Sequence, residues 1–578
     1  MRITVAKTAG FCMGVRRAVD MVLDAANGSG TPIFTYGPLI HNPQVLEMLA
    51  AKGISRLDAI PEKGEGIVLI RAHGVPPEDE IALEKAGFTV INATCPRVVR
   101  VQVIIDKYAQ KGYAAIIVGD RNHPEVKGLL GYARGNGYTV TGLEQLPSLP
   151  SFENAVVVAQ TTQNTVFYDA VKNWFAANRP HYRVFDTICG STERRQEEVR
   201  HLAATHDAVI VVGGRQSGNT RRLAQVAAQS HARATHIEDV SEIDFAALAG
   251  TRSIAITAGA STPNWIITDT CDKVTRHLQH QRPVAGFISK IQEVLLKTNL
   301  LLALGAGSLT YACSVVQKLP HTLVHAAIAM LYVLSMQVLN NIFAIKSDAY
   351  NRPDRAVFYR RHRNLLGALA VFSGGAGLYL AFTTGMTSFF ILLVMSLLGL
   401  AYNLRIIPRG VSRKQIRRIK DIPGSKTILI TMAWGVVTSI LPAVDTSSSP
   451  AWMAVAFFYA AGLVFSRTAV FDIMAIQGDR IAGRETLPIL LGEKKSFFLI
   501  RCVLVSVVGL LAGAWLTGLP FSITFLLALV PGLLLLLIRS FEREKRVSGI
   551  QVEFLIESSF LLTGGLVAVF QESIRSIF

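Results

Sequence analysis

Three cysteines in the first half of the chain stand in settings that suit metal chemistry. Cys12, Cys95 and Cys189 are almost evenly spaced, and each lies beside or close to a glycine or proline, as at a turn from a strand into a helix. Even spacing suggests three similar α/β lobes that each contribute one thiolate to a shared centre. Three thiolates leave one position open, which suits a 4Fe-4S cluster whose fourth iron binds substrate, or alternatively a zinc ion. Spacing alone, however, favours three ordinary buried cysteines.

Polar residues in glycine-containing segments recur through the same half of the chain. Taken singly, each histidine among them is more typical of a structural residue. Together they offer the hydrogen-bond donors that an anion needs, and a diphosphate needs many of them. The residues concerned are His41, His73, His123, Glu125, Thr161, Ser217, Gly218, Asn219 and Ser261.

The elements that must position these residues follow from the hydrophobic pattern. Up to about residue 280, apolar runs of strand length alternate with amphipathic helical stretches, the clearest runs being 67–70, 114–118, 155–158, 209–212 and 254–257. This alternation predicts βαβ units around parallel sheets. Ligands of such sheets collect where strands end and helices begin. The predicted fold class of this half is therefore α/β, in three similar lobes around a metal centre.

With these motifs in order, residues 1 to about 280 resemble the 4-hydroxy-3-methylbut-2-enyl diphosphate reductase family over its full length. The resemblance implies that Cys12, Cys95 and Cys189 hold a 4Fe-4S cluster whose open iron binds the hydroxymethyl oxygen of the substrate. It also implies that Glu125 supplies a proton, assisted by Thr161 and His123. Thr192 would lie close to the cluster, and the diphosphate would be bound by His41, His73, His123, Ser217, Gly218, Asn219 and Ser261.

The family commonly has serine where this chain has Gly218, so one hydrogen bond to the diphosphate is expected from the backbone or water. The implied reaction yields isopentenyl and dimethylallyl diphosphates and needs two electrons, delivered singly, with a positioned acid to protonate the departing oxygen. The resemblance further implies an electron carrier such as ferredoxin or flavodoxin, and sensitivity to oxygen. If the three cysteines instead bind zinc, the protein is a different metalloenzyme.

The second half of the chain has the composition of a membrane protein. Half of all 578 residues are hydrophobic and only 17% are charged, while the formal net charge is +17. Residues 281–297 are predicted to form a basic linker and membrane-entry segment. After it the sequence predicts nine membrane helices, near 298–316, 322–343, 365–383, 387–404, 427–444, 451–470, 497–516, 520–538 and 552–571. Lys and Arg gather in alternate loops, which predicts that these loops and the first half face the cytoplasm. Because membrane loops account for most of the positive charge, nucleic-acid binding is not expected.

Two cytoplasmic loops of the second half carry acidic residues with arginine. Such carboxylates are often solvated helix ends, but two such loops suggest opposing Mg²⁺ sites around a diphosphate. The candidate residues are Asn340, Asn341, Asp348 and Arg352 in the first loop, and Asp472, Asp479 and Arg480 in the second.

Residues 285–578 resemble the UbiA superfamily of intramembrane prenyltransferases, which implies transfer of a prenyl group to an aromatic or other lipid-precursor acceptor. Both acidic signatures depart from the family pattern, because Asn341, Ala344 and Ala475 stand where it usually has Asp. The alternative is a degenerate domain that only tethers the reductase.

The sequence thus predicts a fusion of a reductase domain, 1–280, with a membrane domain, 298–578. The protein is expected in the inner, cytoplasmic membrane as a multi-pass protein with its reductase in the cytoplasm. Cys271, Cys313 and Cys502 are interpreted as packing residues, and no disulfide is expected.

Overall fold

The computed structural model divides into two compact units, Met1–Val274 and Thr275–Phe578, which are described separately. It describes residues 2–28, 30–230, 233–280, 283–319, 323–402, 422, 424–444, 446, 448–482, 484, 486–544 and 549–575. The basic loop at 405–420 and residues 545 and 546, on which part of the predicted orientation rests, lie outside this range. The boundary between the two units falls within helix α9 (Asn264–His280), whereas the domain end expected from the sequence is residue 280.

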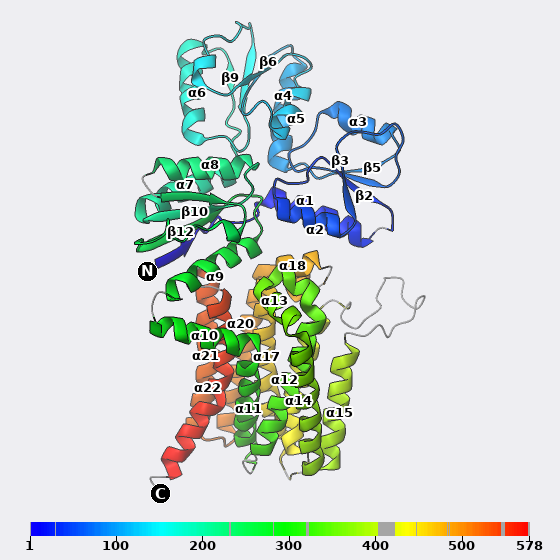
Figure 1. Cartoon of the computed structure of the whole chain (residues 1–578), viewed down its shortest axis with the longest axis vertical. Coiled ribbons are helices and arrows are strands. Elements are labelled where there is room, and N and C mark those ends of the chain that lie inside the picture. Colours follow the sequence, from blue (N-terminus) through cyan, green and yellow to red (C-terminus); the bar gives the residue numbers. More distant parts are fainter. Residues whose placement is uncertain are drawn as a thin grey trace. The chain divides into compact units, whose positions relative to one another are not determined.

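The first unit contains three parallel sheets of four strands each (Figure 1). One sheet has the order β3-β2-β4-β5, made of Ile54–Leu57, Ile33–Tyr36, Ile67–Ile70 and Thr89–Asn92. The next has the order β7-β6-β8-β9, made of Gly137–Val140, Ala114–Val118, Ala155–Ala159 and Arg183–Val184. The third has the order β11-β10-β12-β1, made of Arg233–Ile237, Ala208–Val212, Ser253–Ala258 and Arg2–Val5.

The three sheets share one topology. In each sheet, the first strand of the lobe (β2, β6 or β10) lies between the second (β3, β7 or β11) and the third (β4, β8 or β12). The fourth strand (β5, β9 or β1) pairs with the third and forms the other edge of the sheet. The third lobe takes its fourth strand, β1, from the start of the chain, and Arg2 of β1 pairs with Ser253 of β12. Figure 1 shows this dark blue strand within the green lobe. The prediction of three similar lobes is therefore confirmed, and the third lobe is closed by a segment distant in sequence.

Strand burial explains why these sheets are parallel and central. All five residues of β6, of β8 and of β10 are buried, as expected when helices cover both faces of a sheet. Successive residues face opposite sides: Ile116 and Val118 belong to one apolar core, and Ala115 and Ile117 to another. The covering helices are α1 (Met13–Gly28), α2 (Pro43–Ala51), α3 (Pro77–Lys85), α4 (Pro96–Ala109), α5 (Pro124–Gly131), α6 (Thr165–Asn178), α7 (Gly190–Thr205), α8 (Gly218–Gln229) and α9.

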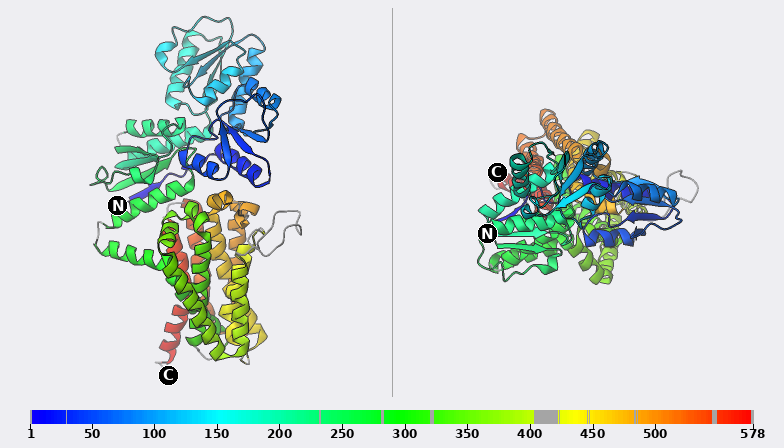
Figure 2. Two further views of the ribbon diagram at one scale, coloured as in Figure 1. Left: turned by 45° about the vertical axis from the view of Figure 1, so that its right-hand side comes forward. Right: turned by 90° about the horizontal axis from the view of Figure 1, so that it is seen from above.

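All the described secondary-structure elements of the second unit are helices, and its long helices run side by side (Figure 2). Its longer helices are α10 (Pro283–Lys297), α11 (Leu300–Val316), α12 (Leu323–Asn351), α14 (Arg363–Thr384), α15 (Met386–Ala401), α16 (Ser425–Gly435), α17 (Pro450–Met474), α20 (Glu493–Leu516), α21 (Phe521–Glu544) and α22 (Gly549–Arg575). Short helices α13 (Pro353–Arg361), α18 (Ile476–Ile481) and α19 (Leu487–Leu491) connect them.

Fewer helices are long enough to span a membrane than the nine predicted. Within the described residues seven qualify, and an eighth requires α10 and α11, bent by 72°, to count as one span. The predicted span at 387–404 is α15, whose 16 residues cover only about 24 Å at 1.5 Å per residue, short of a hydrocarbon core of about 30 Å. Apolar composition identified this helix correctly, and residues 403 and 404 of the predicted span lie outside the described residues.

Small residues let the spanning helices approach closely. A side chain added at Gly305 of α11 would come within 2.8 Å of Phe560 on α22, and one at Gly564 of α22 within 2.2 Å of the Ser308 carbonyl oxygen. Lipid is as apolar as the helix surfaces, so close van der Waals packing of this kind must hold the bundle together.

Candidate functional site

All thirteen residues predicted for the first unit line one cavity of 90 Å³. Topology explains why they meet. The cysteines follow the fourth strand of each lobe, β1, β5 or β9, and the polar residues follow the inner strands β2, β4, β6, β8, β10 and β12. The carboxyl ends of parallel strands share one edge, where ligands of open α/β sheets bind.

Each cysteine stands at the start of a helix. Cys12 directly precedes α1, while Cys95 and Cys189 are the N-caps of α4 and α7. The positive end of a helix favours a thiolate, and the Cys12 sulfur accepts a hydrogen bond from the Val15 amide at 3.5 Å. Burial nevertheless raises the pKa of the Cys95 thiol, against the effect of nearby backbone amides. A thiolate here therefore needs further positive charge, such as that of a metal.

The spacing of the three thiols separates the two metals considered from the sequence. Zinc holds each sulfur at about 2.3 Å, which would bring three thiolates within about 4 Å of one another. In the described part of the chain, the one set of three His, Cys, Asp or Glu side chains whose ligand atoms all lie within 4.8 Å is His41, His73 and His123. At least one pair of the three thiol sulfurs is therefore more than 4.8 Å apart, farther than a single zinc ion requires. A cluster, whose cysteines bind different irons, fits the wider spacing.

Glu125 is held as a buried acid on the first turn of α5. It is 1% exposed, and its carboxylate oxygens accept hydrogen bonds from the Thr161 amide at 2.7 Å and the Thr161 hydroxyl at 3.0 Å. Burial raises the pKa of Glu125 to about 7, although both hydrogen bonds act in the opposite direction. This carboxyl group can therefore hold or release a proton near neutral pH.

Three neutral imidazoles face one another across the cavity. The ring centroids of His41 and His73 are 4.9 Å apart, and those of His73 and His123 are 5.3 Å apart. Burial, helped by Arg71 and Arg221, lowers the pKa of His41 to about 4, and burial with neighbouring cationic groups lowers that of His123 to about 3. His41 Nε2 and His73 Nδ1 are buried without a hydrogen-bond partner. Nearby arginine charge disfavours a metal cation at this triad and favours an anion.

The remaining polar groups continue this anion site. His123 Nδ1 accepts from the Glu125 amide at 3.1 Å, which orients its ring. Ser217, the N-cap of α8, receives a hydrogen bond from Ser261 at 3.3 Å between hydroxyl oxygens. Asn219 Nδ2 is buried and unpartnered. A side chain at Gly218 would meet His123 Nε2 at 3.4 Å, an ordinary contact, so serine would fit there.

Two structural supports of the cavity were not anticipated from the sequence. A side chain at Gly14 would approach the Cys95 sulfur to 2.4 Å, so only glycine leaves room for that thiol. Arg195, buried on α7, donates to the carbonyl oxygens of Ala258 at 3.1 Å and Gly10 at 2.7 Å. Arg195 follows another arginine in a polar helix, and such a sequence is typical of a solvent-exposed helix face. The sequence therefore offered no signal for the burial of Arg195.

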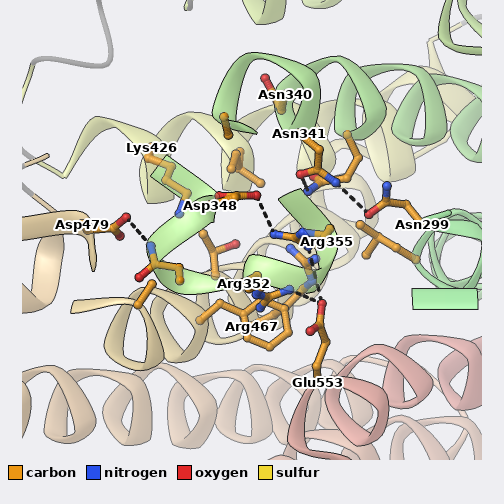
Figure 3. A pocket seen from close by; sticks show the side chains of 18 of the residues that line it. Asn299, Asn340, Asn341, Asp348, Arg352, Arg355, Lys426, Arg467, Asp479 and Glu553 are labelled. Carbon is orange, nitrogen blue, oxygen red and sulfur yellow. Dashed lines mark hydrogen bonds and ion pairs between the residues drawn. The ribbon is translucent and has the colours of Figure 1, made fainter. Parts of the chain in front are cut away.

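The second unit has its own cavity, of 160 Å³, at the ends of α12, α16, α17 and α22 (Figure 3). Five of the seven residues predicted there line it: Asn340, Asn341, Asp348, Arg352 and Asp479. Asp472 and Arg480 do not. Asp472 is fully buried beside the cavity, where it accepts hydrogen bonds from Lys426 Nζ at 2.5 Å and the Thr427 hydroxyl at 2.7 Å.

Charged residues that were not predicted as site residues from the sequence also line this cavity. Arg467 on α17 donates to Glu557 on α22 through Nε at 3.0 Å, and both side chains are buried. Ionisable residues buried inside spanning helices are rare, and such pairs usually mark functional positions. The sequence does carry a signal for this pair, because Arg467 and Glu557 are ionisable residues inside otherwise apolar segments. Lys426, Arg355, Arg484 and Glu553 also line the cavity.

The fold and the two cavities define a protein of two joined parts. One is a three-lobed α/β part with thiols and anion-binding groups around a single cavity, and the other is a multi-pass membrane part with a charged cavity. The LytB protein family matches residues 3–275, and the UbiA prenyltransferase family matches residues 300–558. The chain belongs to the 4-hydroxy-3-methylbut-2-enyl diphosphate reductase family through its first unit, and carries a UbiA-family domain in its second.

Individual relatives cover the first unit almost completely. The 4-hydroxy-3-methylbut-2-enyl diphosphate reductase of Geotalea daltonii is 40% identical over 274 residues, 47% of this chain and 97% of that protein. That of Aquifex aeolicus is 40% identical over 275 residues, 47% of this chain and 95% of that protein. Among solved structures, a UbiA homolog from Archaeoglobus fulgidus bound to GPP and Mg²⁺ is 16% identical, with a TM-score of 0.35, over 48% of this chain and 98% of that one.

Proposed function

We propose that the first unit reduces 4-hydroxy-3-methylbut-2-enyl diphosphate to isopentenyl and dimethylallyl diphosphates. The observation that carries this proposal is a single cavity that combines three thiols at helix starts, a buried acid with a pKa near 7, and unpartnered donors suited to an anion. The reaction breaks the bond between carbon and the hydroxyl oxygen, consumes two electrons and two protons, and releases water.

The cysteines present fit a 4Fe-4S cluster in number, position and spacing. When bound, such a cluster supplies single electrons and an iron with Lewis-acid character. Glu125 then protonates the departing hydroxyl group, and Thr161 holds its carboxyl group in place. His41, His73 and Asn219 donate hydrogen bonds to the diphosphate, and Ser217 and Ser261 extend the same wall. A carrier of the ferredoxin or flavodoxin class delivers the electrons.

The test is anaerobic turnover of the purified full-length protein with a chemical reductant. We expect both diphosphate products, and we expect Cys189→Ser to abolish their formation together with the brown colour of the cluster. A colourless wild-type protein that contains zinc would contradict the proposal, since zinc has no visible absorbance. Near-normal turnover by Cys189→Ser would contradict the ligand assignment.

For the second unit, we propose transfer of a prenyl group from its diphosphate to an aromatic or lipid-precursor acceptor in the membrane. Support comes from a cavity that brings arginines and polar groups together at the ends of apolar helices. The asymmetric loop charges favour the inner membrane with the reductase and this cavity on the cytoplasmic side. A tether without catalysis is the competing role, favoured by Ala344 and Ala475.

Diphosphate release from membranes that contain the protein distinguishes these roles. A panel of prenyl diphosphates is supplied with aromatic acceptors, once with Mg²⁺ and once with a chelator. We expect release with at least one pair, and loss of that release in Asp479→Asn, since Asp479 lines the cavity. Release that is unchanged in this variant would assign the activity to another protein of the membrane.

A further inference from the structure

The carboxylates of the membrane cavity are already engaged by cations of the chain. Asp348 accepts from Arg355 at 3.2 Å, and Arg355 also lies 3.8 Å from Glu553, which pairs with Arg352 (Figure 3). Both oxygens of Asp472 are taken by Lys426 and Thr427. Paired carboxylates in these positions are poor ligands for a second cation.

The other motif residues do not replace the missing ligands. Ala344 and Ala475 offer no side-chain oxygen, and Asn341 is uncharged with its amide bonded to Asn299 and Tyr359. Asp479 accepts from Asn351 at 3.0 Å and keeps one unpartnered oxygen. Mg²⁺ demands a near-octahedral set of oxygens, usually including one or two carboxylates. These residues do not fit the two opposing Mg²⁺ sites expected from the family resemblance.

Three arginines line the cavity, and each is paired with a carboxylate: Arg352 with Glu553, Arg355 with Asp348 and Arg467 with Glu557. The guanidinium groups of Arg352 and Arg467 lie 5.3 and 4.9 Å from the centre of the Phe471 ring, and Phe471 lines the cavity. Arg355 keeps a buried Nε without a partner. Stacking on one ring holds two positive groups near each other, which a bound anion would stabilise. The planar guanidinium also matches phosphate oxygens in pairs.

We propose that Arg352, Arg355 and Arg467 bind the diphosphate of a prenyl diphosphate directly, without Mg²⁺. This inference rests on the proposed function of the second unit and names how its donor is held. Lys426 on Asp472 supplies a fixed positive charge beside the cavity, where the family pattern would place a metal. The acidic residues then neutralise part of the arginine charge when no diphosphate is bound.

The test is equilibrium binding of geranylgeranyl diphosphate to the full-length protein in detergent. Arg355→Gln changes only the second unit, so weaker binding by this variant assigns the bound probe to that unit. We expect its Kd to change less than about threefold when Mg²⁺ is replaced by EDTA, and Arg355→Gln to weaken binding about tenfold. A loss of more than about tenfold in EDTA, or no binding in either condition, would overturn the proposal.

Asp348→Asn gives the sharpest contrast, because the two explanations predict opposite signs. If Asp348 binds metal, the change weakens the probe about tenfold or more. If it neutralises Arg355, the change leaves affinity unaltered or raises it, and Glu553→Gln acts in the same direction. Weaker binding by both variants would overturn the proposal. Binding without Mg²⁺ in a protein that transfers no prenyl group would support the arginine site and contradict the proposed transferase activity. Prenyl transfer with strictly Mg²⁺-dependent binding would support the transferase activity and contradict the arginine site.

Discussion

At the residue scale, the protonation of Glu125 sets the expected pH dependence of the reductase. Its pKa is raised to about 7 by burial, so the carboxyl group is mostly protonated below that pH and ionised above it. Because the proposed role is that of an acid, turnover should fall as the pH rises through about 7. An anaerobic profile of kcat against pH measures this decrease, which forms the falling limb of the profile at high pH. Glu125→Gln should lower kcat by about 100-fold or more and remove the limb.

Thr161 provides a second test of the same carboxyl group. Its hydroxyl donates to Glu125 and favours the ionised form, so Thr161→Val should raise the pKa of Glu125 and move the falling limb to higher pH. Thr161→Ser keeps the hydroxyl and should leave the limb in place. An unchanged limb in Thr161→Val would mean that another group controls the profile.

Gly14 is expected to be essential for cluster assembly. A methyl group there would lie 2.4 Å from the Cys95 sulfur, so Gly14→Ala must displace this ligand. We expect the purified variant to lose most of its visible absorbance and iron. Gly190 beside Cys189 is the matched control, since a side chain there meets nothing within 4 Å. Equal iron content in Gly14→Ala and wild type would contradict this prediction.

At the scale of elements, Arg195 joins α7 to the last residue of β12 and to the segment that follows β1. Arg195→Met leaves two buried carbonyl oxygens without their donor, which should lower the free energy of unfolding of the first unit by about 2–4 kcal/mol. Arg194→Met, at the exposed neighbouring position, is the control and should change stability little. Thermal unfolding followed by cluster absorbance compares the two variants, and equal midpoints would contradict the prediction.

Sequence patterns predicted some elements and contacts better than others. The inner strands β4, β6, β8, β10 and β12 were predictable because burial on both faces requires continuous apolar runs. That three lobes share one cavity was predictable from the cysteine spacing only together with the polar residues that follow the strands. The pairing of Asp472 with Lys426 was not predictable, since the two residues lie on different helices and no local pattern links them. The bend between α10 and α11 was missed because residues 281–297 were predicted to form a linker and not a helix.

At the scale of the whole molecule, the two units have separate apolar cores. The clusters around Ile116, Val98 and Leu223 use residues of the first unit, and those around Leu463 and Val338 use residues of the second. A chain that ends at His280 should therefore fold, leave the membrane fraction and keep its reductase kcat within about twofold. Fractionation with anaerobic turnover measures both properties. A loss of kcat above about tenfold would show that the reductase depends on the membrane unit.

The pairing of β1 with β12 has a consequence for the timing of biogenesis. β1 leaves the ribosome long before its partner strand, so the third lobe stays open until residue 258 has emerged. That lobe brings Cys12, Ser217 and Ser261 to the cavity. The next segments to emerge are α9 and then the apolar helices that need a membrane. On the proposed function, the cluster site is therefore completed only shortly before the apolar helices emerge, so iron delivery cannot begin much earlier than insertion into the bilayer.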